Sequence, residues 1–545
     1  MLSTQVPSVG NGLMKDDGFT YVFPIRKDVK FHNGDILTPE DVVYSMKRAM
    51  IFDRSGGPAW MLCEPLLGAY SIEDVVVETL GVENYSDLFV DGDPRGELQS
   101  EYEETMKKVF TDYVEKTIEI DGDNVVFHLA QAYGPFLNIL AHCSNWASII
   151  DKKWAIEQGA WDGKADTWWK YHDPENEKDP LYAVENGTGP FVLKTWIPEE
   201  LVLLERFDDY WQGPAKIKNV QIKYINEYTT RKLMLQTGDV DMAYIPVQYI
   251  SEVEKIAGVE VTKNLPTLAN VVSMFPWTIN AEGNSYIGSG KLDGEGIPPD
   301  FFSDIHVRKG FSYLFPYDIF ISKVAKGMAI RNPGPIPKGV LGFTEDPALY
   351  YEFSLLKAKK EFQMAWGGAL WEKGCQFNIF YVEGNDVQKA ASDMLSTYAK
   401  ILNPKFNLRP IGLQGAAFMD AFLSEKLPLF TIGWLADYPD PHNWAPVYMG
   451  SHGDYSSFFG EAYREFAKEN VDPLLEQGLK ETDKEKRAAI YKELTQIAHE
   501  QAISIYAYQP GLSHIQRTWI KGWYFNPIMP GEPEGADFYN LTKGE

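Results

Sequence analysis

Cysteine is scarce in this sequence, which contains only Cys63, Cys143 and Cys375. Three thiols permit one disulfide at most, and none of them lies in a C-x-x-C pair. Zinc binding and dithiol redox chemistry are therefore disfavoured. A Cys63–Cys143 bridge and buried free thiols both stay open as interpretations.

Long apolar runs are missing as well. The most apolar stretch, residues 136–150, is interrupted by His142, Ser144 and Asn145, so no segment approaches the 18 residues of a membrane span. The first residues lack the basic and apolar segments of a signal peptide. We therefore expect either that a signal has been removed or that the sequence begins inside the mature protein.

Positive charge is in deficit, because the sequence contains 77 Asp and Glu but only 51 Lys and Arg, which gives a formal net charge of −26. A field of this sign repels phosphate backbones, so we expect no nucleic-acid partner. Catalytic patterns are absent too: no G-x-S-x-G nucleophile motif occurs, and the nine histidines are scattered singly. The sequence therefore predicts neither an enzyme nor a bound metal or other cofactor.

Aromatic side chains are abundant, with 15 Trp, 30 Tyr and 30 Phe making 14% of the 545 residues. Trp and Tyr offer large stacking faces and a hydrogen-bonding group, which suits ligand clefts. An acidic, aromatic-rich composition is typical of extracytoplasmic binding proteins and of secreted glycosidases alike.

Local signals predict a mixed α/β protein. Residues 19–23 alternate as a half-buried strand, which Pro24 moves toward a sheet edge. Thr38 and Pro39 open a helix to about residue 50, and a turn at 121–122 joins two strands. Thr482 begins a capping box and a helix. Further strands are expected at 191–196, 201–205, 220–224 and 377–382, and helices at 226–236, 304–313, 355–362 and 387–399.

Several segments, in order along nearly the whole chain, carry a family resemblance. They are FTYVFPIRKDVKFHNGDILTPEDVVYS (19–45), GTGPFVLKTW through LQTGDVDMAYI (187–245), DIHVRKGFSYLFPYD (304–318), GWLADYPDP (433–441) and EKRAAIYKELTQIAHEQAISIYAYQP (485–510). Together they resemble the family 5 extracellular solute-binding proteins, which include the dipeptide- and oligopeptide-binding receptors of ABC importers.

The resemblance implies a two-lobed α/β clamp of the periplasmic-binding-protein type with an additional third domain. The first lobe would be discontinuous, formed by residues 1–37, 185–272 and 507–545, and apparently truncated at its N-terminus. The extra domain would be residues 38–184, and the second lobe residues 273–506.

The same resemblance implies how the clamp works. Hinge strands near 273–277 and 504–508 would let the lobes close around a peptide or other small solute, and the closed form would deliver it to a permease in the membrane. The protein would be an extracytoplasmic monomer, with a lipid anchor as one way of attachment. Binding and closure, and no chemistry, would be its function.

Asp437, in GWLADYPDP, is the first candidate site residue. In peptide-binding members the acid at this position of the motif pairs with the ligand's α-amine, because a desolvated ammonium needs an opposite charge. The alternative is a turn residue that caps its own loop. The candidate pocket walls are aromatic: Trp434 and Tyr438 on the same loop, Trp277 on a predicted hinge strand and Trp60 in the extra domain. Each is also explained as an ordinary core aromatic.

Two further features bear on the ligand. Some small-peptide binders of this family clamp the ligand carboxylate with a basic residue where this sequence has Thr431, so longer peptides or ligands without a carboxylate are favoured. An oligosaccharide-binding member of the family is an alternative, and a secreted glycosidase is another. The glycosidase would need two arranged carboxylates, but Asp437 and Asp440 are flanked by Pro439 and Pro441, which suit a loop.

Overall fold

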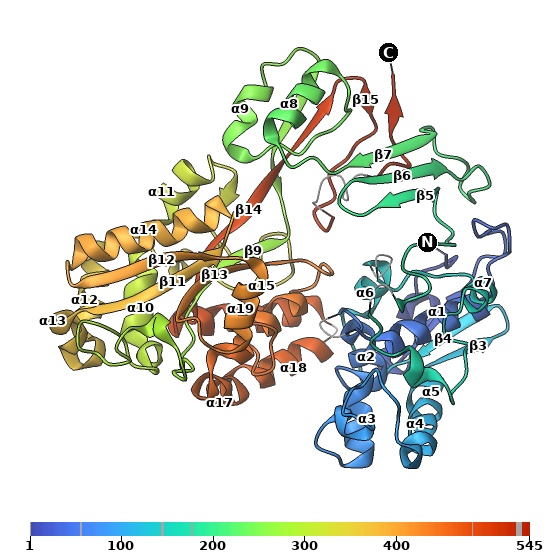
Figure 1. Ribbon diagram of the computed structural model, residues 1–545, viewed down its shortest axis with the longest axis horizontal. Helices are drawn as coiled ribbons and strands as arrows, with labels where there is room; N and C mark the ends of the chain where they lie inside the picture. The colour runs from blue at the N-terminus through green and yellow to red at the C-terminus, as the bar shows by residue number, and fades with distance from the viewer. Residues whose placement is uncertain are drawn as a thin grey trace. The chain divides into compact units, whose positions relative to one another are not determined.

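The computed structural model describes residues 2–54, 57–142, 146–175, 178–481, 483–529 and 537–544. The chain divides into two compact units (Figure 1). The first comprises Met1–Glu227, Trp519–Tyr524 and Asp537–Glu545, and the second Tyr228–Thr518 and Phe525–Ala536. Both mix helices and strands, which confirms the predicted α/β class. The lobe boundaries expected from the resemblance stay predictions.

The first unit contains an antiparallel sheet in the order β1 (Met14–Lys15), β2 (Thr20–Pro24), β4 (Asn124–His128) and β3 (Ile118–Asp121). The hairpin predicted at 121–122 is confirmed, with Asp121 opposite Asn124. The expected edge position of β2 is wrong, since β2 lies between β1 and β4. Pro24 is tolerated because it ends the strand, where its carbonyl accepts the amide of Thr4 at 2.9 Å.

Helices pack around this sheet. The helix start predicted at Thr38 is confirmed by α1 (Pro39–Phe52), whose capping box pairs Thr38 with Asp41. Its buried face carries Val42, Met46 and Met50. The other helices of this unit are α2 (Trp60–Leu67), α3 (Ile72–Leu80), α4 (Glu103–Val109), α5 (Glu115–Thr117), α6 (Phe136–His142) and α7 (Lys152–Glu157).

Two smaller sheets complete the first unit. The paired strands predicted after residue 190 are confirmed as β5 (Phe191–Ile197), β6 (Leu201–Arg206) and β7 (Asn219–Lys223), which form an antiparallel sheet. The short strands β15 (Ile520–Lys521) and β16 (Thr542–Lys543) pair with each other.

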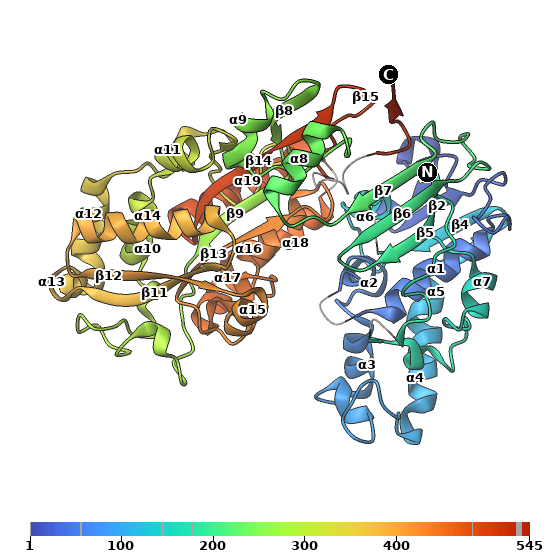
Figure 2. The same ribbon diagram turned by 45° about the horizontal axis from the view of Figure 1, so that its top comes forward.

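The second unit is built on a seven-stranded sheet (Figure 2). Its path runs β10 (Ala329–Ile330), β14 (Ser504–Arg517), β9 (Ala269–Met274), β13 (Leu429–Leu435), β11 (Cys375–Val382) and β12 (Phe406–Leu413), and β8 (Val259–Pro266) also pairs with β14. β11 is parallel to β12 and β13, whereas β9 is antiparallel to β13 and β14. Trp277, expected on the hinge strand, lies three residues beyond the end of β9.

Both faces of this sheet are buried, because successive residues of its central strands enter different cores. Ile379 and Leu429 belong to one core, and their neighbours Phe380 and Phe430 belong to the other. The helices of the second unit are α8 (Tyr228–Thr237), α9 (Ile250–Val253), α10 (Ile305–Leu314), α11 (Tyr317–Ile319), α12 (Leu355–Met364), α13 (Ala369–Lys373), α14 (Asp386–Leu402), α15 (Gly415–Leu423), α16 (Ala445–Met449), α17 (Glu461–Asn470), α18 (Asp472–Lys480) and α19 (Lys484–Glu500).

The helices and the buried strand predicted for this unit are confirmed with shifts of a few residues, except at the start of α19. There the N-cap is Asp483, whose carboxylate accepts the amides of Glu485 and Lys486, each at 3.0 Å. Thr482, the predicted cap, lies outside the described residues. A carboxylate so placed also interacts favourably with the helix dipole.

The cysteine alternatives are resolved in part. Cys63 on α2 and Cys375 on β11 are buried free thiols, while Cys143 lies outside the described residues. None of the helices within the described ranges is long and apolar enough to cross a membrane.

Candidate functional site

Asp437 lies in the loop that follows β13. Its backbone amide donates to Asn443 Oδ1 at 2.9 Å, and Asn443 Nδ2 donates to Asp437 Oδ2 at 2.8 Å. The residue therefore does close its own loop, as the alternative interpretation expects. It is nevertheless only half-buried, and a carboxylate can accept about four hydrogen bonds, so loop closure and ligand binding are compatible.

Trp434 lies near the end of β13 and shares the same partner. Its indole Nε1 donates to Asn443 Oδ1 at 3.2 Å, and its ring meets that of Tyr455 edge-on, with 5.4 Å between centroids. The side chain is half-buried. Two of the five predicted site residues, Trp434 and Asp437, are therefore held in one hydrogen-bonded group.

Tyr438 and Trp277 are placed differently. Tyr438 is 0% exposed, and Trp277 is 8% exposed within the hydrophobic core of the second unit. The Arg308 guanidinium lies 4.1 Å from the centroid of the Trp277 ring, and the Tyr463 ring packs edge-on at 5.2 Å. Their burial gives both rings a packing role, and direct ligand contact by either stays a prediction.

Trp60 belongs to the first unit, where it is the first residue of α2. It is half-buried, and its ring lies 6.1 Å from that of Tyr70. Its part in ligand binding also stays a prediction. Tyr133, three residues before α6, is buried and donates to Glu64 at 2.6 Å, which gives it a packing role.

Asp440 is engaged in a buried ion pair. Arg487 on α19 binds its two carboxylate oxygens at 2.6 and 2.7 Å, and both side chains are almost fully buried. A carboxylate tied in this way is unsuited to act as one of the two catalytic acids of a glycosidase. Neighbouring His442 is also buried, and burial lowers its pKa to about 4, so it is neutral at physiological pH.

The charge of Asp437 affects two neighbouring groups, Asp454 and Tyr455. Desolvation raises the pKa of Asp454, and the negative charge of Asp437 raises it further. The pKa of Tyr455 is raised by burial and then by the charges of Asp454 and Asp437. The Asp437 carboxylate therefore acts as a negative charge on both neighbours, in addition to the effect of their burial.

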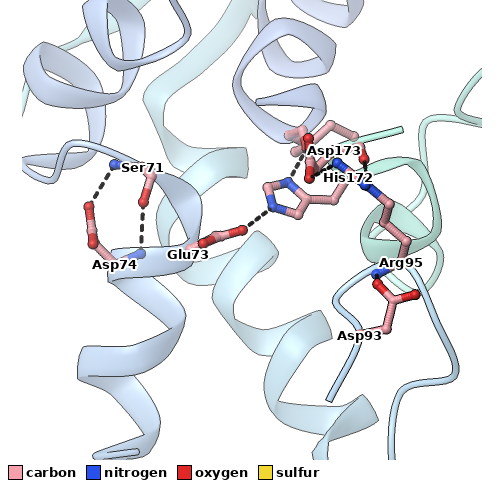
Figure 3. Close-up of polar contacts among 8 residues, drawn as sticks. Ser71, Glu73, Asp74, Asp93, Arg95, His172 and Asp173 are labelled. Carbon is pink, nitrogen blue, oxygen red and sulfur yellow. Dashed lines mark hydrogen bonds and ion pairs between the residues drawn. The ribbon is translucent and has the colours of Figure 1, made fainter. Parts of the chain in front are cut away.

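A second polar cluster lies in the first unit (Figure 3). His172 is buried between two acceptors, the Ile51 carbonyl at 2.9 Å from Nδ1 and the Glu73 carboxylate at 2.8 Å from Nε2. Burial alone would lower the pKa of His172, but these hydrogen bonds and the charges of Glu73 and Asp53 raise it above the ordinary value. Because both nitrogens must donate, the imidazolium has no lone pair for a metal or for general-base chemistry.

Arg95 and Asp173 form an ion pair in the same cluster. Arg95 binds the Asp173 carboxylate at 2.6 Å and its carbonyl at 2.7 Å. Burial raises the pKa of Asp53 to about 6, although the positive charge of His172 opposes this. No group of three or more potential metal-ligating side chains occurs within the described ranges. We therefore regard the cluster as structural.

Asn443 and Arg487 were not predicted from the sequence. Asn443 is two residues beyond the end of the GWLADYPDP motif, and a buried asparagine next to a motif carries no signal of its own. Arg487 is 47 residues from its partner Asp440, and only the folded sheet and α19 bring them together.

Comparison with known proteins shows the family to which the chain belongs. The profile of the bacterial extracellular solute-binding proteins, family 5 (Middle), matches residues 12–456. The chain belongs to this family, and the resemblance seen in the sequence is thereby confirmed.

Individual relatives are distant but cover the chain. The oligopeptide-binding protein OppA of Bacillus subtilis is 24% identical over 95% of this chain and 81% of its own. The structure of the periplasmic binding protein DppA from Helicobacter pylori with the peptide STSA is 19% identical, with a TM-score of 0.66, over 100% of this chain and 89% of that one. The oligopeptide-binding protein AppA from Bacillus subtilis with a nonapeptide is 18% identical, with a TM-score of 0.66, over 100% and 90%. These structures confirm the periplasmic-binding-protein fold.

Proposed function

We propose that this solute-binding protein captures oligopeptides outside the cytoplasm and delivers them to an ABC-transporter permease. The Asp437 carboxylate would bind the ligand's α-amine, and Trp434 would form a wall beside it. Tyr438 and Trp277 would support that wall, and the role of Trp60 would be to contact a ligand side chain. The capture of oligopeptides is supported by relatives that are named as peptide-binding or that were solved with a peptide bound.

One observation carries the proposal. A half-buried carboxylate is fixed by Asn443 and lies beside an indole, and its charge raises the pKa of Asp454 and of Tyr455 in addition to the larger effect of their burial. An ammonium placed beside such a carboxylate in a closed site meets an opposite charge that offsets its desolvation, so ligands with an amine are favoured.

The first experiment identifies what the protein retains. The purified protein is incubated with a synthetic mixture of lysine-free peptides of various lengths, washed by ultrafiltration and analysed by mass spectrometry. Retained peptides support the proposal. A co-purified glycan with no peptide would replace it with the oligosaccharide alternative, and steady release of sugar would replace it with the glycosidase.

Asp437→Ala then tests the amine anchor. We expect the affinity for the most abundant retained peptide to fall at least about tenfold, or 1.4 kcal/mol, when measured by titration calorimetry. Asp437→Asn, which keeps the shape and removes the charge, is expected to lose nearly as much. Unchanged affinity in both variants would contradict the role of Asp437.

A further inference from the structure

Asn443 is fully buried, and within the part of the chain that the structure describes its amide bonds to two predicted ligand-binding residues. Oδ1 accepts the Asp437 amide at 2.9 Å and the Trp434 indole at 3.2 Å, while Nδ2 donates to the Asp437 carboxylate at 2.8 Å. These partners fix the orientation of the amide, because a flipped group would set NH₂ against two N–H donors and its oxygen against a carboxylate.

The position of Asn443 is itself fixed by the turn that contains it and by the ion pair that holds this turn. It ends the short turn Pro441–Asn443, which Asp440 caps by accepting the amide of His442 at 3.0 Å. Asp440 is held by Arg487, whose Nε also donates to the Gly478 carbonyl at 2.6 Å. A chain of buried bonds therefore links α19, through Asp440 and the turn, to Asn443.

We propose that Asn443 is a positioning residue for ligand capture: its amide holds the Asp437 carboxylate and the Trp434 indole together so that they select ligands with a free amine. This inference rests on the proposed function. A carboxylate held in one orientation loses less conformational freedom when it binds an ammonium, so the bound geometry is prepared in advance.

A coupling experiment tests this role. The synthetic peptide mixture is used in two forms, with free amines and with acetylated amines, and the affinity of each retained peptide is measured in both forms. We expect the protein to prefer the free amine about tenfold, and we expect Asn443→Ala to lose most of that preference while its affinity for acetylated peptides stays within about threefold. In an Asp437→Ala background, Asn443→Ala should have no further effect on the preference.

The matched control is Asn403→Ala. Asn403 is also buried, donates to the Trp371 carbonyl at 3.0 Å and accepts the amide of Lys405 at 3.1 Å, but it lies at the end of α14. Its loss is expected to lower stability and to leave the preference for the amine unchanged. If Asn443→Ala does not fold, Asn443→Ser replaces it in the experiment. We expect the same loss of preference for the free amine, because one hydroxyl cannot replace both the acceptor and the donor of the amide.

The outcomes separate the inference from the proposed function. A wild-type protein that retains peptides without preferring the free amine would refute the Asp437 anchor, and with it the inference that depends on it. A wild-type preference that persists in Asn443→Ala, or an equal loss for free and acetylated peptides, would leave the anchor standing and overturn the positioning role.

Discussion

Arg487 and Asp440 carry the most deeply buried ion pair near the candidate site. Removing two charges from water is costly, and their attraction offsets that cost only when the geometry is good and other groups are satisfied. Here the pairing is bidentate, Arg487 also donates to the Gly478 carbonyl, and Asp440 also accepts the His442 amide. The main effect of the pair is therefore to fix the position of the loop, and its contribution to the net free energy of unfolding is smaller.

Arg487→Met is accordingly expected to destabilise the second unit by about 3–5 kcal/mol, because Asp440 would stay buried without its partner. Adding Asp440→Asn should recover part of the loss, since the unpaired charge is then removed. Urea unfolding measures both variants. The control is Lys389→Met in the exposed Lys389–Asp393 pair, which should leave the midpoint unchanged. A loss in Arg487→Met as small as in this control would refute the argument.

Among the helices, α1 and α3 are joined by the side chain of His172. His172 donates to the carbonyl of Ile51, near the end of α1, and to Glu73, in the first turn of α3. Ser71 and Asp74 cap the same end of α3, as Figure 3 shows. The start of α3 therefore depends on the proton that keeps His172 charged.

The stability of this junction should fall as pH rises. The pKa of His172 is raised in the folded state, so its contribution is complete below about pH 6.5, the ordinary value, and is lost as pH rises through the folded value. Asp53 acts in the same direction at lower pH, because its pKa is raised from 3.8 to about 6 and its contribution is lost as pH rises between these two values. Hydrogen-exchange protection of the α3 amides is expected to be greater at pH 6 than at pH 9.

Two histidine variants separate this effect from general alkaline destabilisation. His172→Gln should reduce protection at pH 6 and flatten its pH dependence. His128→Gln, which removes an exposed pair with Glu119, should leave α3 unaffected. A pH dependence that is the same in His172→Gln as in the wild type would assign the effect to other groups.

The elements that the sequence predicts well are those whose signals are local. The α1 capping box, the β3–β4 turn and the buried strand β11 followed by α14 each occupy a few consecutive residues. The errors have non-local causes. The neighbours of β2 are set by pairing with residues that the local pattern does not reveal, and the choice between adjacent cap residues at α19 depends on backbone geometry.

The candidate site shows the same division between residues that a local motif predicts and residues that only the fold brings together. Asp437 and Trp434 belong to a motif that can be read directly, whereas Asn443 and Arg487 acquire their roles only from contacts formed on folding. Burial also separates Tyr438 from its half-buried neighbours, although all three lie within five consecutive residues. Side chains alternate between the two faces of a sheet only within a strand. This alternation ends with β13, so the sequence pattern could not predict which side chains of the following loop are exposed.

For the whole molecule, each unit has its own sheets and its own packed side chains. The family resemblance implies that ligand capture involves a change in the arrangement of lobes, whereas Asp437, Trp434 and Asn443 all belong to the second unit. We therefore expect ligand attachment and lobe closure to be separable steps, which different measurements can follow.

We expect the radius of gyration from small-angle X-ray scattering to decrease when a saturating retained peptide is added, because closure makes a two-lobed molecule more compact. Asp437→Ala at the same peptide concentration should show a smaller decrease, since its lower affinity leaves more of the protein without ligand. Raising the peptide concentration should restore the full decrease, because the variant has lost affinity and not the capacity to close. A wild-type radius that stays constant while calorimetry shows saturation would refute closure and leave the amine anchor unaffected.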